Sequence, residues 1–188
     1  MHNFLDDINY LGSLLLNGKV ILCPTDTIWG LSCNAFDKNA VDRIYKIKKR
    51  DRAKPFILLA KDIDQVKRYT KNLHPRIETL LSYYNKPLTV IHQAVDTFPR
   101  HLINEKNQVA IRICKHPLIQ KVITNIDQLL VSTSANLQGQ PTPLVLEEIP
   151  SLVKNKVDYI CHDHKQENNR IASTIINYNS EGELFFVR

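Results

Sequence analysis

The chain has 188 residues, of which 43% are hydrophobic and 23% are charged. These proportions are ordinary for a folded globular protein and exclude a disordered or a fibrous chain. Lysine and arginine outnumber the acidic residues by 25 to 19, a net charge of +6, which favours an anionic partner such as a nucleotide or RNA. A basic surface that only maintains solubility explains the same charge.

Taken in chain order, hydrophobic spacing, prolines and capping residues predict alternating helices and strands. Helices are expected from residue 4 to the stop at Gly18, over 37–47 and 62–69 with aspartate caps, over 75–84, from Pro117 onward and over 144–153. Strands are expected over 19–23, 56–60, 88–92, 109–113, 129–133 and 157–161, followed by a hairpin of 173–178 with 183–188.

The final hairpin requires antiparallel pairing, whereas the alternation before it favours parallel pairing. We therefore expect an α/β fold with a twisted, open, mixed parallel and antiparallel sheet and flanking helices. No repeat, linker or low-complexity stretch interrupts the sequence, so residues 1–188 are expected to form a single domain.

Several common signatures are missing from the sequence. It has five glycines and neither GxGxxG nor GxxxxGK[ST], so side chains would have to do most of the work of holding a nucleotide. The four cysteines are widely spaced and form no CxxC pair, which favours a reducing compartment. No apolar run approaches the ~18 residues of a membrane span, and no signal peptide is evident. We expect a cytoplasmic protein with no membrane partner.

The first informative segment is 24–30, PTDTIWG, which follows an expected strand. It gathers two threonine hydroxyls, a carboxylate, an indole and a glycine in one short loop. Open α/β sheets usually bind ligands in such loops at the carboxyl ends of strands. A turn in which Asp26 and Thr27 satisfy their own backbone explains the segment equally well.

The second segment, 46–55 (KIKKRDRAKP), carries six cations and the single acid Asp51. Cations this crowded repel one another unless an anion neutralises them, and arginine presents a planar fork to phosphate oxygens. Neighbouring lysines point about 100° apart on a helix, so Lys48 and Arg50 can converge only where the helix ends. A solvated basic helix face is the alternative.

The third segment, 131–143 (VSTSANLQGQPTP), is rich in hydroxyl and amide groups that can bind phosphate or a small polar ligand without adding charge. A Ser/Thr-rich turn or helix cap is the alternative. Arg112 lies inside an apolar strand and needs a partner, for which a carboxylate is the natural choice. His162 and His164 lack a clear third ligand, so no metal site is predicted, and no catalytic nucleophile can be assigned.

Together these motifs resemble the threonylcarbamoyl-AMP synthase (TsaC/YrdC) family. The resemblance covers nearly the whole chain and rests on the order and spacing of PTDTIWG, KIKKR…KP, VAIRI with His116 and Pro117, STSAN, and Ser173 with Thr174. The chain looks like the short, single-domain form of the family. Trp29 stands where tyrosine is commoner, which is expected to keep an aromatic wall.

The resemblance implies a YrdC-like fold with a concave basic face. It also implies that the protein forms threonylcarbamoyl-AMP and pyrophosphate from L-threonine, bicarbonate and ATP, with Mg²⁺ accompanying ATP, for the t6A modification of tRNA. The family signature that would carry catalysis matches Lys48, Arg50, Ser134 and Asn136. By motif matching, ATP would be held by these four residues with Lys54, Thr142 and Arg188, and L-threonine by Thr27, Arg112, Ser132 and Ser173.

Two other functions remain open from the sequence alone. A non-catalytic module could bind tRNA or double-stranded RNA on the same basic surface, although the hydroxyl-rich segment around 132–142 is more than phosphate binding requires. A regulatory sensor could bind ATP without turnover. For the enzyme, tRNA and the proteins that complete t6A formation are the expected downstream partners.

Overall fold

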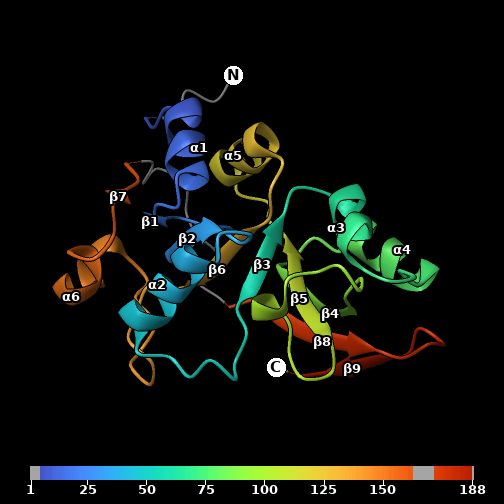
Figure 1. Ribbon diagram of the computed structural model, residues 1–188. Coiled ribbons are helices and arrows are strands. Elements are labelled where there is room, and N and C mark those ends of the chain that lie inside the picture. Colours follow the sequence, from blue (N-terminus) through green and yellow to red (C-terminus); the bar gives the residue numbers. More distant parts are fainter. Residues whose placement is uncertain (1–4, 163–171, 188) are drawn as a thin grey trace.

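The computed structural model describes residues 5–162 and 172–187, which form one nine-stranded sheet with helices packed on it (Figure 1). The strands are β1 (Ile21–Cys23), β2 (Gly30–Asn34), β3 (Ile57–Ala60), β4 (Leu88–Gln93), β5 (Gln108–Ile113), β6 (Leu130–Ser134), β7 (Tyr159–Ile160), β8 (Thr174–Tyr178) and β9 (Leu184–Phe186). The α-helices are α1 (Ile8–Leu16), α2 (Lys38–Lys48), α3 (Ile63–Tyr69), α4 (Pro75–Tyr83), α5 (Pro117–Ile126) and α6 (Ser151–Lys154), and two 3₁₀ turns span Arg100–Leu102 and Leu146–Glu148.

The strand order across the sheet is β7-β1-β2-β6-β3-β5-β4-β8-β9. Pairing is parallel between β1 and β7, β3 and β5, and β4 and β8, and antiparallel at the other five junctions. The predicted mixed sheet and the final hairpin of β8 and β9 are therefore confirmed.

Local sequence signals explain where several helices begin. The Asp37 carboxylate accepts hydrogen bonds from the backbone N–H groups of Asn39 and Ala40 at the start of α2. Asp62 caps α3 in the same way, and Pro75 occupies the first turn of α4. The first N–H groups of a helix have no partner within the helix. The aspartate carboxylates accept hydrogen bonds from such groups, and proline has no N–H to be paired. These predictions are confirmed.

One prediction from local pattern is wrong, and one strand was missed. The single helix expected over 144–153 is a 3₁₀ turn at Leu146–Glu148 followed by the short α6, because Pro150 between them has no N–H to continue a helix. The sequence reasoning also missed β2, which directly follows the PTDTIWG loop. Its partners are β1 on one side and the distant β6 on the other.

Alternating side chains divide the core between the two faces of the sheet. Leu22 joins the cluster that packs around α2, whereas its neighbours Ile21 and Cys23 join the cluster beneath α1 and α5. Figure 1 shows α1 and α5 side by side over one end of the sheet. On β3 and β6, Leu59 and Leu130 belong to the cluster of α1 and α5.

The face that carries Leu59 and Leu130 is covered by helices only in part. Two residues along the same strands, Ile57 and Ser132 lie opposite each other in register and line an open cavity. The site described below thus occupies the part of this sheet face that α1 and α5 leave open. In the described part of the chain, no helix is long and apolar enough to cross a membrane.

Candidate active site

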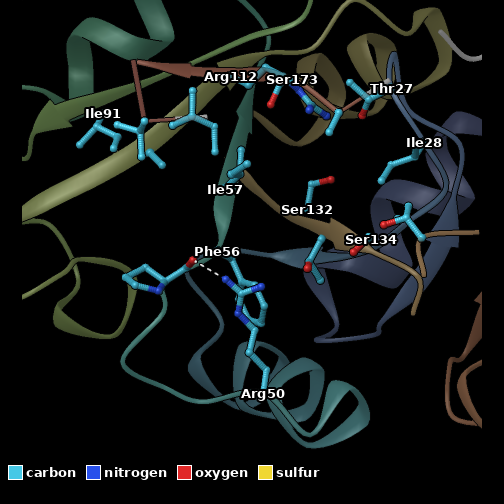
Figure 2. Close-up of a pocket in the computed structure, with 18 of the residues that line it drawn as sticks. Thr27, Ile28, Arg50, Phe56, Ile57, Ile91, Arg112, Ser132, Ser134 and Ser173 are labelled. Atoms are coloured by element: carbon cyan, nitrogen blue, oxygen red, sulfur yellow. Dashed lines mark hydrogen bonds between the residues drawn. The ribbon is translucent and has the colours of Figure 1, made fainter. Parts of the chain in front are cut away.

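The cavity has a volume of about 340 Å³ and opens over strands from the middle of the sheet (Figure 2). Its lining combines two arginines with hydroxyl groups, amides and aliphatic side chains, and none of the described lining residues is acidic. The polar groups are Arg50, Arg112, Thr27, Ser132, Thr133, Ser134, Thr142, Ser173, Asn104 and Gln108.

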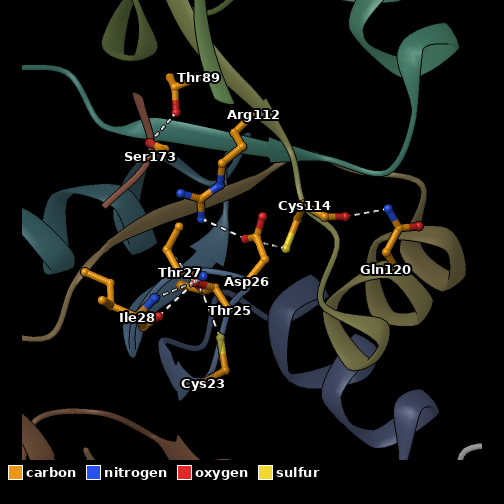
Figure 3. A network of polar contacts seen from close by, with 11 residues as sticks. Cys23, Thr25, Asp26, Thr27, Ile28, Thr89, Arg112, Cys114, Gln120 and Ser173 are labelled. Atoms are coloured by element: carbon orange, nitrogen blue, oxygen red, sulfur yellow. Dashed lines mark hydrogen bonds and ion pairs between the residues drawn. The ribbon is translucent and has the colours of Figure 1, made fainter. Parts of the chain in front are cut away.

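Arg112 lies at one end of the cavity, on β5, with only 4% of its surface exposed. Its Nη2 forms an ion pair with Asp26, whose Oδ1 lies 3.3 Å away (Figure 3). The buried Cys114 thiol donates to the same oxygen at 3.3 Å, and burial raises the pKa of this thiol, which keeps it protonated as a donor. The carboxylate partner that sequence reasoning required for Arg112 is thus Asp26. Arg112 Nε is itself buried, but the residue lines the cavity and its guanidinium carries five N–H donors, so it retains donor capacity for an anion.

Thr25 gives the 24–30 loop its shape. Its Oγ1 donates to the carbonyl of Ile28 at 2.8 Å and accepts the backbone N–H of Thr27 at 3.2 Å. The Thr27 hydroxyl lies 2.9 Å from the same oxygen, and either hydroxyl can be the donor. Thr27 lines the cavity, where its hydroxyl oxygen can accept a hydrogen bond from an amine.

Gly30 and Ser173 bring further backbone and hydroxyl groups close to the cavity. A Cβ at residue 30 would lie 3.2 Å from the carbonyl oxygen of Thr133 and 3.3 Å from Ser132 Oγ, closer than an ordinary van der Waals contact. The glycine of PTDTIWG thus lets β2 approach the hydroxyls of β6. Ser173 Oγ, just before β8, is held 2.8 Å from the buried Thr89 Oγ1 (Figure 3).

Arg50 lies at the other end of the cavity, after the end of α2 (Figure 2). Its Nε donates to the Lys54 carbonyl at 3.0 Å and its Nη2 to the Pro55 carbonyl at 3.1 Å, and the guanidinium lies 5.0 Å from the centre of the Phe56 ring. Partial burial lowers the pKa of Arg50 without removing its charge. These contacts hold a permanent cation at the rim.

Lys48 lies beneath the cavity rather than in its lining. Its side chain is buried, and its Nζ donates to the carbonyl oxygens of Ser134 and Asn136 and to Asn136 Oδ1 at 3.0 Å. Asn136 Oδ1 also accepts from Ser134 Oγ at 2.6 Å, while Asn136 Nδ2 donates to the Gln140 carbonyl. Burial lowers the pKa of Lys48 to about 8. The ammonium group of Lys48, at the end of α2, therefore holds in place the segment that carries Ser134 and Asn136.

The structure brings most of the predicted site residues to one cavity. Those that line it are Arg50, Ser134 and Thr142 of the expected ATP set and Thr27, Arg112, Ser132 and Ser173 of the expected threonine set. Lys48 and Asn136 do not line the cavity but are hydrogen-bonded to Ser134, which does. Lys54 is exposed and also lies outside the lining. Arg188 lies outside the described residues. Contact of these residues with ATP or threonine stays a prediction.

Comparison with known proteins identifies the family. The sequence model of the Sua5/YciO/YrdC family, described as "Telomere recombination", matches residues 13–188. The chain belongs to this family. The threonylcarbamoyl-AMP synthase of Pseudoalteromonas translucida is 32% identical over 149 residues, 77% of this chain and 79% of that protein. The threonylcarbamoyl-AMP synthase of Coxiella burnetii (strain RSA 493) is 30% identical over 161 residues, 85% of this chain and 87% of that protein.

The fold is also shared with a solved member of the Sua5/YciO/YrdC family. The crystal structure of P. abyssi Sua5 complexed with L-threonine superposes with a TM-score of 0.87 at 27% identity, covering 96% of this chain. This chain spans about half of that longer protein, 53%. The predicted YrdC-like fold is confirmed.

Sequence reasoning missed part of this Sua5/YciO/YrdC site. Trp29, expected as an aromatic wall, packs in the core with 4% exposure, and the aromatic residue that lines the cavity is Phe56. Asn104 and Gln108 were not singled out. For Gln108 a signal existed, because on a strand it alternates onto the same face as Arg112, four residues later.

The other predictions about metals and cysteines fall partly on described residues. Within them, no group of three or more His, Cys, Asp and Glu side chains could hold a metal ion, and His162 pairs with Asp6 at 3.2 Å. His164 lies outside the described residues. All four cysteines are buried and none of them forms a disulfide within the described residues.

Proposed function

We propose that this protein joins L-threonine, bicarbonate and ATP to form threonylcarbamoyl-AMP, with release of pyrophosphate and water. The curated relatives named above support this activity, and the observation that carries it is the composition of the cavity. Two guanidinium groups flank a set of neutral hydroxyls in one open space, without an acidic lining residue among those described. Such a lining suits two anionic substrates bound together.

L-threonine would bind at the Arg112 end of the cavity. The Arg112 guanidinium is suited to the carboxylate, and the Thr27 hydroxyl oxygen can accept a hydrogen bond from the amine. Ser132 and Ser173 line the same end and can bond the threonine hydroxyl or the carbamate. Threonine binding in P. abyssi Sua5 supports this assignment.

ATP would bind toward Arg50, Ser134 and Thr142. The Arg50 charge is suited to the phosphates, and two hydroxyl donors add bonds without further repulsion between cations. Because no described lining residue carries a carboxylate, an accompanying Mg²⁺ would take its ligands mainly from phosphate oxygens and water, with Ser134 and Thr142 as the hydroxyls in reach. The ion would neutralise charge on the phosphates.

The chemistry needs positioning more than it needs a nucleophile from the protein. The amine of threonine and bicarbonate give a carbamate, and a carbamate oxygen then attacks the α-phosphorus while pyrophosphate leaves. Arg50 stabilises the charge that moves to the pyrophosphate, Arg112 holds the threonine carboxylate, and confinement replaces a collision between separate molecules. This agrees with the lining residues that the structure describes, which include hydroxyls and guanidiniums but no cysteine or histidine.

The product would serve t6A modification of tRNA by downstream proteins, in the cytoplasm. Exposed Lys46, Lys49 and Lys54 lie within four residues of Arg50 in the chain and would allow contact with tRNA or other RNA phosphates. The relatives' names support the enzyme over a non-catalytic RNA module.

The test is incubation of the purified protein with ATP, L-threonine, bicarbonate and Mg²⁺, with threonylcarbamoyl-AMP measured by mass spectrometry and pyrophosphate by a coupled assay. We expect both products in equal amounts, and neither when threonine or bicarbonate is left out. ATP binding without threonine-dependent product would instead identify a nucleotide sensor, and RNA binding alone would identify the non-catalytic module.

A further inference from the structure

Ser173, a hydroxyl residue of the proposed threonine site, lies just outside the regular sheet. It immediately precedes β8, whose first residue, Thr174, donates its backbone N–H to the Pro87 carbonyl at 3.2 Å. Because Ser173 itself is not part of the strand ladder, side-chain contacts decide where its hydroxyl points. Its Oγ lies 2.8 Å from Thr89 Oγ1, and Figure 3 shows the two hydroxyls facing each other.

Thr89 lies on β4, between β5 and β8. In register it stands opposite Arg112 of β5 on one side and Ile175 of β8 on the other. Ile91, two residues later on β4, lines the cavity, so Thr89 faces the same side of the sheet. Thr89 is nevertheless fully buried, with 0% of its surface exposed, and is not among the described residues that line the cavity. Its hydroxyl can therefore act on a substrate only through another residue.

The surroundings of the two hydroxyls differ in what they offer to a proton. The distance alone allows either oxygen to be the donor. The Thr89 hydroxyl forms no other hydrogen bond with a described residue, and a buried O–H without an acceptor is costly. Ser173 lines the cavity, where a ligand oxygen can take its proton. Both protons are used when Thr89 donates to Ser173 and Ser173 donates to the ligand.

We propose that Thr89 is a positioning residue of the threonine site, whose hydroxyl donates to Ser173 Oγ and thereby directs the Ser173 proton toward the threonine carboxylate. This inference rests on the proposed function. Since Thr89 stands directly opposite Arg112, the Ser173 hydroxyl lies at the same end of the cavity as the Arg112 guanidinium. A neutral donor beside the guanidinium adds a hydrogen bond to the carboxylate without adding charge.

The experiment compares Thr89→Val, which loses the hydroxyl and keeps the branched shape, with Thr89→Ser, which keeps the hydroxyl. Calorimetry measures the dissociation constants of L-threonine and of ATP for each variant. We expect Thr89→Val to bind threonine about tenfold more weakly and Thr89→Ser to stay within about twofold of the wild type, with ATP affinity unchanged in both. Thr89→Ala, with no added methyl group to pack, should match Thr89→Val.

Thr70→Val is the matched control for the loss of a buried threonine hydroxyl. Thr70 is buried, its Oγ1 donates to the Val66 carbonyl at 3.0 Å, and it does not line the cavity. We expect this variant to bind threonine as the wild type does.

A double-mutant cycle with Ser173→Ala separates positioning from a general structural role. Ser173→Ala alone should weaken threonine binding about tenfold. If Thr89 acts through the Ser173 hydroxyl, adding Thr89→Val to Ser173→Ala causes no further loss. A structural role in the sheet would instead give the same additional loss in both backgrounds.

The outcomes judge this inference separately from the proposed function, because threonine binding is measured without turnover. Unchanged threonine affinity in Thr89→Val, an equal loss of ATP affinity, or the same loss in the Ser173→Ala background would overturn the role of Thr89, whether or not threonylcarbamoyl-AMP is made. Threonine binding that depends on Thr89, without any product, would overturn the proposed function alone. A wild type that binds no threonine would overturn both.

Discussion

Replacing Lys48 by methionine removes the ammonium group that fastens the Ser134 loop to α2 and keeps a side chain of similar length. Three buried oxygens then lose their donor: the carbonyls of Ser134 and Asn136 and the Oδ1 of Asn136. Asn136 Oδ1 still accepts a hydrogen bond from the Ser134 hydroxyl. The loss of hydrogen bonding therefore falls mainly on the two backbone carbonyls.

The expected loss of stability follows from the two carbonyl oxygens that are left without this donor. Leaving a buried polar group without its partner costs about 1 to 3 kcal/mol. Lys48→Met is therefore predicted to lower the free energy of unfolding by about 2 to 6 kcal/mol. In addition, kcat/KM for ATP should fall at least tenfold, about 1.4 kcal/mol of barrier.

Urea denaturation, followed by the fluorescence of the single, buried Trp29, measures the stability. Lys46→Met is the matched control, since Lys46 lies on the same helix with its side chain exposed. If both variants unfold at the same urea concentration and turn over substrate alike, the assignment of Lys48 to the loop is refuted.

The lowered pKa also gives a pH dependence with a definite sign. Between about pH 8 and pH 10.5 the unfolded chain keeps the Lys48 proton while the folded chain has lost it. The unfolded state therefore binds more protons, and the Lys48 contribution to the free energy of unfolding rises with pH across this window. The wild type minus Lys48→Met difference, measured at pH 7.5 and pH 10, should show this rise, and a flat or falling difference would contradict the burial of the ammonium group.

The remaining predictions concern the two ends of the cavity. Arg112→Lys keeps the charge beside Asp26 but loses the planar fork, and we expect KM for threonine to rise at least tenfold with a smaller change in kcat; an unchanged KM would remove Arg112 from the threonine site. Arg50→Ala should lower pyrophosphate release at least tenfold, about 1.4 kcal/mol, and release close to wild type would contradict its role. Serine, which lacks the methyl group, should have a kcat/KM lower by roughly 1 to 3 kcal/mol in barrier terms; equal values for the two amino acids would count against a methyl contact.

Local signals in the sequence sufficed for much of the fold. Asp37 and Asp62 mark helix starts because each carboxylate bonds N–H groups only two or three residues away. β2 was not found in this way. It pairs with β1 nearby and with β6 about 100 residues later, and because it is buried on both faces it lacks the alternation of apolar and polar residues that marks a strand. Pro150 did give a local signal against the helix expected over 144–153, and the apolar spacing there was given too much weight.

The same distinction applies to the site. The residue types of Arg112 and Arg50 predict anion binding, because a guanidinium placed beside apolar strands needs a partner. The sequence could not show that Asp26 takes one edge of Arg112, or that Lys48 turns inward to carbonyl oxygens, since both depend on contacts between distant segments. The orientation of the Gln108 amide in the cavity lining likewise depends on a contact, the hydrogen bond from Asn104 Nδ2.

The most direct test is a crystal structure of the protein with L-threonine and a non-hydrolysable ATP analogue bound together. We predict that both molecules occupy the one cavity, with the threonine carboxylate within hydrogen-bonding distance of Arg112 and the phosphates on Arg50. Threonine and nucleotide in separate places, or a cavity that holds neither, would contradict the account.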